Sequence, residues 1–469
     1  MTRNRLAVSA ISIAAVISVG SATRFVVTRQ TGQGVKASAA AATVHRPRVL
    51  GVRPCAHAVT GPEDVVLRGM IGGWIATHPA TSVTIWRTDS TCPIDVGGAN
   101  NTLALLPASN EKLLTTTAAL MSLGPQYRFT TRLVVATSTS LARISHGTLA
   151  APVTLIGSGD PVFATSAYSH SYLGANGDTL NALASRARHP LGVAGPTLTR
   201  IVGSLRVNGT VFDSRSVSPG WTAADIGSIQ PLSGAASNED FAGDSQGSVV
   251  SSPVLATAQR LRAALHGARI STVGAVGAGP LPSHPTTIAA VTSPTISSIA
   301  RIMNVPSDDF IAEQLLKALG ASAHAPGTSA AGAAVVRRDL AALLGVIRPG
   351  SRVSDGSGLS RGDRESSLSL AWLILDAQRN LAWGGPLLAS LPTAGQGTLR
   401  TRLHGLAGRV HAKTGTLNDV SSLTGTIRAS DGKTYTFSIL CNGLKSAQIQ
   451  AAHNFQDAIV QRLAHGVAG

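Results

Sequence analysis

Residues 106–124, LPASNEKLLTTTAALMSLG, are the most informative part of the sequence, because a helical pattern begins there beside a hydroxyl and an amine. Apolar side chains recur at helical spacing from Leu113 to Met121. Pro107 near the start and Gly124 at the end are ordinary helix boundaries. The stretch therefore predicts one helix whose first turn carries polar side chains.

Ser109 and Lys112 are the polar pair in this first turn. A spacing of three residues places both side chains on one helix face, one turn apart. A lysine that is partly desolvated beside another cation can lose its proton and act as the base for a serine nucleophile. The helix N-terminus favours the negative charge that develops there. The pair alone is common by chance, and a surface lysine is its simpler interpretation.

A second candidate is Lys413-Thr414-Gly415-Thr416, in a pattern typical of a strand. Gly415 would let a ligand backbone approach the strand edge. Lys413 would supply a fixed positive charge, and Thr414 a hydroxyl for a carboxylate. The backbone N–H of Thr416 could join that of Ser109 in an oxyanion hole. Alone, this pattern also fits a solvated turn.

The third candidate, Ser307-Asp308-Asp309, stands directly before the helical pattern FIAEQLLKALG. On local evidence it is an ordinary helix N-cap. The order of the three patterns changes that interpretation. S-x-x-K at a helix start, S-D-x before a helix and K-T-G on a late strand together form the signature of penicillin-binding proteins and serine β-lactamases.

The resemblance is closer than this superfamily, because seven motifs along the chain contribute to it. They are PASNEKLLTT, GSGDP, GTVFD, PGW, MNVPSDDFIAEQLLK, DGSGLSR and HAKTGTL. From about residue 60 to its end the chain resembles the DacB-like class C penicillin-binding proteins, the D-alanyl-D-alanine carboxypeptidase/endopeptidase family. The long separation between Ser109 and Ser307 is similar to the large insertion of that family.

The resemblance implies a role for each motif residue. Ser109 would be the acylated nucleophile and Lys112 its base, while Ser307 and Lys413 would pass a proton to the leaving amine. The strand residues and the DGSGLSR motif would bind substrate, through Thr414, Gly415, Thr416 and Arg361. No metal and no organic cofactor is implied. The implied partners are peptidoglycan peptides that end in D-Ala-D-Ala or carry cross-links, and β-lactam inhibitors.

Three positions depart from the family pattern. Asp309 replaces an Asn whose amide would donate to the peptide carbonyl, which an ionised carboxylate cannot do. We expect Asp309 to form an ion pair with Lys112 or Lys413, which would hold that lysine charged and weaken it as a base. Asn208 and Asn418 occupy positions that resemble the family's recognition site for a substrate amine, where the usual residues are Asp and Gln. Loss of the Asp charge at position 208 puts tight recognition of a free substrate amine in doubt, whereas an amidated or cross-linked peptide still fits.

The remaining patterns predict an α/β (α+β) fold of the penicillin-binding/β-lactamase-like transpeptidase type. Residues 52–127 and 288–469 would form an antiparallel sheet flanked by helices, and residues 128–287 a β-rich inserted domain. Outside the helix already described, the expected elements are a strand at 83–87, a turn at 97–101, helices at 293–320, 332–345 and 447–463, and three late strands with a hairpin turn at Asp431-Gly432.

Composition narrows the function classes. The length of 469 residues favours two or three folding units, and 43% hydrophobic residues exclude general disorder. Half of the net charge of +16 comes from residues 1–54. No Lys/Arg-rich run is interleaved with aromatics, so nucleic-acid binding is not expected. A basic surface suits an anionic polymer such as a cell wall.

The N-terminus has the plan of a secretory signal, with Arg3 and Arg5 before the uncharged run Leu6–Thr23. We expect residues 1–29 to be a signal peptide or a single membrane anchor, and residues 30–51 a flexible tether. This predicts an extracytoplasmic protein, in the periplasm or cell wall, that meets a membrane only through this segment.

The three cysteines leave two possibilities open. Cys55 and Cys92 could pair and leave Cys441 free, or all three could be unpaired buried thiols. No CxxC motif supports zinc or redox chemistry.

The leading hypothesis is an exported serine D-Ala-D-Ala carboxypeptidase/endopeptidase that trims peptidoglycan stem peptides through an acyl-enzyme on Ser109. The alternative is a catalytically weakened penicillin-fold protein that binds wall peptides or a partner, as Asp309 suggests. A β-lactamase or esterase on this scaffold lacks a recognisable acidic deacylation base.

Overall fold

The computed structural model describes residues 55, 57–61, 64–137, 141, 144–174, 177–190, 192–193, 195–344 and 350–467. The predicted signal or anchor (1–29) and tether (30–51) lie outside the described residues. Among the helices that are described, none is long and apolar enough to cross a membrane.

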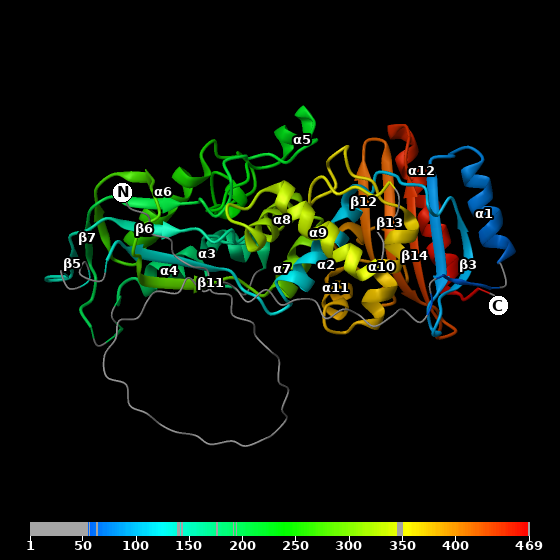
Figure 1. Cartoon of the computed structure of the whole chain (residues 1–469), viewed down its shortest axis with the longest axis horizontal. Helices are drawn as coiled ribbons and strands as arrows, with labels where there is room; N and C mark the ends of the chain where they lie inside the picture. The colour runs from blue at the N-terminus through cyan, green and yellow to red at the C-terminus, as the bar shows by residue number, and fades with distance from the viewer. Residues whose placement is uncertain are drawn as a thin grey trace, which may run out of the picture. The chain divides into compact units, whose positions relative to one another are not determined.

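The largest sheet combines strands from both ends of the chain (Figure 1). Its central contact is the antiparallel pairing of β2 with β14, in which Val83 lies opposite Ile439. The six strands, in their order across the sheet, are β1 (Val59–Thr60), β3 (Ile94–Ala99), β2 (Thr81–Arg87), β14 (Thr434–Cys441), β13 (Val420–Arg428) and β12 (Val410–Leu417). β12 is thus an edge strand.

Alternation along these strands gives the sheet two different faces. The apolar face consists of side chains such as Val83, Ile85, Leu423, Phe437 and Ile439. The opposite face, here called the hydroxyl face, consists of Ser82, Thr84, Ser422, Thr424 and Ser438, all of them buried. Buried hydroxyls need hydrogen-bond partners, so this face favours a polar neighbour.

Helices cover both faces, as predicted for an antiparallel sheet flanked by helices. α1 (Val65–Ile75) and α12 (Ile449–Ala464) pack on the apolar face. α10 (Ser367–Arg379) packs on the hydroxyl face, where Ser367 Oγ lies 2.8 Å from both Ser82 Oγ and Thr84 Oγ1.

A second core lies among helices beside the hydroxyl face. Its helices are α2 (Glu111–Ser122), α7 (Ile296–Asn304), α8 (Asp309–Ala323), α9 (Ser329–Leu344) and α11 (Gly384–Ser390). The helical pattern predicted over 293–320 forms two helices, and the second begins after Ser307 and Asp308, as the sequence indicates. The helical pattern is broken between α7 and α8, where Ser307 has a φ of +69° that no right-handed helix allows.

Two smaller sheets are formed by strands that come between β3 and β12 in the sequence. The five-stranded sheet has the order β10 (Val276–Ala278), β8 (Leu205–Asn208), β6 (Val153–Ile156), β4 (Thr130–Val135) and β11 (Thr286–Thr292). The three-stranded sheet has the order β5 (Thr148–Leu149), β7 (Arg200–Val202) and β9 (Ser271–Val273). The division of the chain into 52–127, 128–287 and 288–469 stays a prediction.

Residues 128–287, here called the middle segment, also contain helices that the prediction of a β-rich domain missed. They are α3 (Ser166–Tyr168), α4 (Leu180–Arg186), α5 (Ala223–Ser228) and α6 (Pro253–Gly267). The buried residues of α6 recur at Ala258, Leu261 and Leu265, which is helical spacing. The turn expected at 97–101 begins too early, because β3 continues to Ala99. The Asp431-Gly432 hairpin turn is present, with Gly432 at φ +84°.

Of the two possibilities for the cysteines, the structure contains the Cys55–Cys92 disulfide. It joins the segment before β1 to the connection between β2 and β3, with a Cα–Cα distance of 5.6 Å. Cys441 is free and buried, and burial raises the pKa of its thiol to about 12. Its thiol therefore stays protonated and unreactive in the folded protein.

We expect the double variant Cys55→Ser/Cys92→Ser to lose about 2–4 kcal/mol of unfolding free energy, because the disulfide closes a loop of 37 residues in the unfolded chain. Urea titrations of both proteins measure this loss. Thiol counting gives an independent check: the unfolded, unreduced wild type should show only Cys441, and reduction should reveal all three thiols. Equal unfolding free energies for the two proteins would contradict the prediction.

Candidate active site

The turn before α2 keeps Ser109 partly accessible while Lys112 is fully buried. Ser109 lies in a short 3₁₀ turn, η1 (Ala108–Asn110), and Lys112 follows in the first turn of α2. The Lys112 Nζ donates to Ser109 Oγ at 2.9 Å. The hydroxyl and the amine that the sequence places on one face are therefore in direct contact.

The hydroxyl face of the sheet anchors this turn. Ser422 Oγ donates to the Pro107 carbonyl at 2.7 Å, and Asn110 Nδ2 donates to Thr424 Oγ1 at 3.2 Å. These bonds satisfy buried hydroxyls and fix the residues on either side of Ser109. The nucleophile candidate is thus held on the sheet and not on a free loop.

The Lys112 Nζ has three acceptors, which are Ser109 Oγ, Asp309 Oδ1 at 2.5 Å and the Ser357 carbonyl at 2.8 Å. An ammonium has three N–H donors and no acceptor, so this arrangement satisfies the cation completely. A neutral amine fits the same positions, since its lone pair can accept from the Ser109 hydroxyl. The expected ion pair of Asp309 is formed with Lys112.

The break between α7 and α8 separates the roles of Ser307 and its neighbour. The N-cap of α8 is Asp308, whose Oδ1 accepts from the Ile311 N–H at 2.8 Å, so the expectation of Ser307 as the cap is wrong. The Ser307 hydroxyl is turned to another partner, the Nζ of Lys413, at 2.8 Å. Two serine–lysine contacts, Ser109–Lys112 and Ser307–Lys413, therefore occur in one site.

Lys413 is as completely buried as Lys112, but among the residues that the structure describes no carboxylate contacts its amine. Burial lowers the pKa of Lys413 well below its usual value, the charge of Lys112 lowers it further, and Asp309 partly opposes this. The sequence analysis gives Lys413 a fixed positive charge, whereas this shift makes its neutral form easier to reach, and the role of Lys413 stays a prediction. This amine is suited to giving up and taking back a proton.

The edge strand β12 approaches the nucleophile turn at Gly415. A Cβ at this position would lie 2.8 Å from the Ser109 backbone N and 2.9 Å from the Pro107 carbonyl oxygen, so only glycine allows the approach. On either side, Thr414 is buried and donates to Thr398 Oγ1 at 2.7 Å, whereas Thr416 is exposed.

The DGSGLSR loop, residues 355–361, is locked against the same turn. Asp355 accepts from the Gly358 N–H at 2.8 Å, and Glu313 accepts from the N–H groups of residues 356 and 357 at 2.8 Å each. Gly358 has φ +86°, and a Cβ there would lie 1.8 Å from the Ala108 carbonyl oxygen. The loop thus presses on the residue before Ser109 and supplies a carbonyl to Lys112.

The other predicted substrate residues fall into two groups. Arg361 is partly exposed and forms an ion pair with Asp419 at 2.6 Å, while Asn418 is exposed beside Asp419 in the turn after β12. Asn208 is buried at the end of β8, where it donates to the Gly279 carbonyl at 3.0 Å and accepts from Thr210. Among the described residues, none of its hydrogen bonds reaches the Ser109 group, so its role stays a prediction.

Buried carboxyls around α2 are a feature that the sequence analysis missed. Burial raises the pKa of Glu111 well above its usual value, and it raises the pKa values of Glu313 and Glu365 to about 8. Within the described part of the chain, neither carboxyl oxygen of Glu111 has a hydrogen-bond partner. Glu111 lies within the S-x-x-K motif, between Ser109 and Lys112, and this position was the sequence feature that could have indicated a buried carboxyl.

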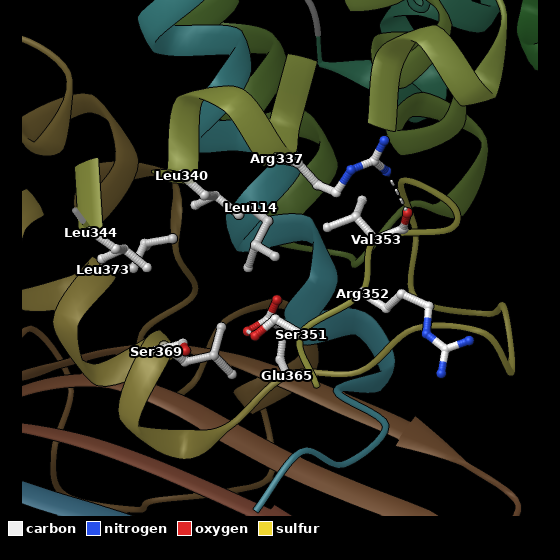
Figure 2. A pocket seen from close by; sticks show the side chains of 11 residues that line it. Leu114, Arg337, Leu340, Leu344, Ser351, Arg352, Val353, Glu365, Ser369 and Leu373 are labelled. Carbon is white, nitrogen blue, oxygen red and sulfur yellow. Dashed lines mark hydrogen bonds between the residues drawn. The ribbon is translucent and has the colours of Figure 1, made fainter. Parts of the chain in front are cut away.

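Figure 2 shows a small pocket beside these carboxyls, where Glu365 and Ser351 lie below Leu114 and Leu373. Its volume is about 20 Å³, which is room for about one water molecule and not for a peptide. Within the described ranges, no three His, Cys, Asp or Glu side chains are grouped so as to hold a metal ion.

Comparisons with known proteins agree with this geometry. A family model described as D-Ala-D-Ala carboxypeptidase 3 (S13) matches residues 98–240 and 232–465. A carboxypeptidase of Mycobacterium tuberculosis is 29% identical over 422 residues, which cover 85% of this chain and 81% of that protein. A D-alanyl-D-alanine carboxypeptidase of Actinomadura sp. is 27% identical over 485 residues, covering 86% and 82%.

Among solved structures, penicillin-binding protein 4 from Haemophilus influenzae has a TM-score of 0.68 and 20% identity, covering 84% of this chain and 99% of that one. This likeness confirms the expected fold. The family match extends over most of the chain and includes all three motifs. The chain therefore belongs to the D-Ala-D-Ala carboxypeptidase 3 (S13) family of serine-type enzymes, and the resemblance drawn from its sequence is confirmed.

Proposed function

We propose that the protein is an exported serine D-Ala-D-Ala carboxypeptidase/endopeptidase that trims peptidoglycan stem peptides through an acyl-enzyme on Ser109. One observation carries this proposal. The Ser109 hydroxyl, partly open to solvent, lies 2.9 Å from the buried amine of Lys112, which Asp309 and the Ser357 carbonyl hold in place. A nucleophile beside an oriented base is the arrangement that acyl transfer requires.

In the acylation step, Ser109 Oγ attacks the carbonyl carbon of the D-Ala-D-Ala bond while its proton passes to the neutral amine of Lys112. The backbone N–H groups of Ser109 and Thr416 stabilise the oxyanion. The C–N bond then breaks. The leaving amine takes the hydroxyl proton of Ser307, and Lys413 reprotonates Ser307 across their 2.8 Å contact. The proton that Lys413 supplies is the one that Lys112 took from Ser109 and passed on, so both lysines end the step as neutral amines.

In the second step, water attacks the ester carbon of the acyl-enzyme and gives up a proton to the amine of Lys112. The C–O bond to Ser109 breaks, and the serine oxygen takes a proton back from the same lysine. Release of D-alanine makes the reaction a carboxypeptidase reaction, and release of a cross-linked peptide makes it an endopeptidase reaction.

Substrate binding in this proposal uses the β12 edge and the rim beside it. Thr414, Gly415 and Thr416 present hydroxyls and backbone to the terminal carboxylate and the carbonyl oxygen. Arg361 and Asn418 lie at the exposed rim. Because Asn208 carries no charge, an amidated or cross-linked peptide suits the site better than one with a free amine. β-Lactams would acylate Ser109 as substrate mimics.

Export is proposed on three supports, none of which involves the site. The N-terminal 29 residues have the pattern of a signal peptide or anchor, the chain has a net charge of +16, and Cys55 is bonded to Cys92. Disulfides persist in oxidising compartments. The protein would act in the periplasm or cell wall and meet a membrane only through its N-terminal segment.

A second candidate function rests on Asp309 alone. Its carboxylate forms an ion pair with Lys112, the proposed base, and it offers no amide donor to a substrate carbonyl. A protein weakened in this way would bind wall peptides or a partner without turning them over.

The first prediction concerns the nucleophile. A fluorescent penicillin should label the wild type covalently, and peptide mapping should place the label on Ser109. Ser109→Ala should show no label and no release of D-alanine from a D-Ala-D-Ala peptide, since it removes the only atom that forms the ester. A label on the wild type at any other residue would contradict the proposed function.

The second prediction concerns the contact of Gly358 with Ala108. Gly358→Ala places a Cβ against the Ala108 carbonyl and shifts Ser109, so penicillin acylation should fall at least about a hundredfold. Gly73→Ala is the matched control, because no atom lies within 4 Å of its new Cβ on α1. It should acylate as the wild type does. Equal acylation rates for the two variants, at similar melting temperatures, would contradict the proposed packing.

The third prediction concerns Asp309. Asp309→Asn removes a negative charge from Lys112 and supplies an amide donor, and it also lowers the pKa of Lys413 further, because Asp309 opposes that shift in the wild type. The neutral amine forms should then persist to lower pH. We expect the acid side of the acylation–pH profile to move toward lower pH, and acylation near neutral pH to be roughly tenfold faster.

Asp431→Asn, in the exposed β13–β14 turn, is the control for the loss of one negative charge and should leave the profile unchanged. If Asp309→Asn acylates no faster at any pH, Asp309 does not limit catalysis. If neither the wild type nor Asp309→Asn is labelled, the binding function takes the lead.

A further inference from the structure

A strained loop in the middle segment lies against the active site. Asn238, Glu239 and Asp240 are consecutive and buried, and their φ angles are +54°, +49° and +57°. A single left-handed residue other than glycine is uncommon, and three in a row persist only where the surroundings impose them. We therefore expect this loop to hold a neighbouring part of the protein in place.

The loop is fixed from both sides. The Asn238 side chain accepts from the Thr165 N–H at 2.8 Å and donates to the Gly243 carbonyl at 3.1 Å. Arg260 donates to the carbonyl groups of Ser237, at 3.0 Å, and of Phe241. These bonds are made by residues on either side of Glu239 and do not involve the Glu239 side chain.

The Glu239 side chain contacts Tyr168 and Asp308 in the interior, and it is also hydrogen-bonded to Gln246. Its Oε2 accepts from the Tyr168 hydroxyl at 2.6 Å, and its carboxyl is hydrogen-bonded to the carboxyl of Asp308. Tyr168 has no exposed surface, so this contact is shielded from solvent. Asp308 is the residue between Ser307 and Asp309.

The segment that Glu239 reaches is itself irregular. Ser307 is left-handed at φ +69°, the Asp308 N–H donates to the Met303 carbonyl at 2.8 Å, and the Asp308 side chain caps α8. A displacement of Asp308 would move the Ser307 hydroxyl away from Lys413 and the Asp309 carboxylate away from Lys112.

We propose that Glu239 is a positioning residue of the active site, which acts through a hydrogen bond to Asp308 and holds Ser307 and Asp309 against the two lysines. The inference rests on the proposed function of those four residues. It also assigns the middle segment a part in assembling the site, in addition to any contact with substrate.

The contact requires a proton, because two ionised carboxylates have no hydrogen between them. Burial raises the pKa of Glu239 to about 8, and the neighbouring charge of Asp308 adds to this rise. The groups that face the pair are Tyr168 beside Glu239, and Asp309 and Lys112 beside Asp308. The protonated form holds the bond at neutral pH, and the bond is lost as pH rises through the raised pKa.

The test compares Glu239→Gln with Glu239→Ala by their rates of acylation with a fluorescent penicillin from about pH 6 to about pH 10. Gln can donate to Asp308 and accept from Tyr168 without titrating. Glu239→Ala should acylate about tenfold or more slowly than the wild type below about pH 8, and this difference should shrink above that pH, where the wild type also loses the bond. Glu239→Gln should restore most of that loss, and its rate relative to the wild type should rise above about pH 8, where only the wild type loses the bond.

Asp240→Asn is the matched control, since burial also raises the pKa of Asp240 to about 8 in the same strained loop. Its acylation rate should change with pH above about pH 8 in the same way as that of the wild type. A change in that pH dependence with Asp240→Asn and not with Glu239→Gln would overturn the inference. So would equal rates for Glu239→Ala and the wild type. A wild type that is not labelled at all would overturn the proposed function, and the inference with it.

Discussion

A fully buried amine must find a hydrogen-bond partner for each of its polar positions, and this requirement organises the active site. The three acceptors of Lys112 come from the 3₁₀ turn η1, from the start of α8 and from the loop at residues 355–361. Those segments are far apart in the sequence and pack in different ways. Because an unpaired buried cation is strongly unfavourable, the amine cannot be buried unless all three are in place.

The two faces of the large sheet make this arrangement possible. One face excludes water by packing apolar side chains against α1 and α12. The other accepts polar segments, because its buried hydroxyls bond to Pro107, Asn110 and Ser367. A uniformly apolar sheet would have left the backbone around Ser109 without partners. The active site therefore depends on the alternation of apolar and hydroxyl side chains along β2, β13 and β14.

The sequence predicts those features that depend on local pattern. The S-x-x-K spacing places Ser109 and Lys112 on one face, and alternation and turn chemistry indicate the three late strands and the Asp431-Gly432 turn. Features that depend on distant partners could not be predicted in the same way. Which lysine Asp309 meets, the choice of Asp308 over Ser307 as helix cap, and the burial of Glu111 all follow from tertiary packing.

Positive φ angles at Ala108 and Ser307 have a consequence for the catalytic cycle. Both residues adjoin or belong to the reacting groups, and both keep conformations that an isolated chain seldom visits. The conformational entropy of these segments is given up when the protein folds. A substrate therefore meets an already ordered site, and none of its binding free energy is consumed in ordering these two turns.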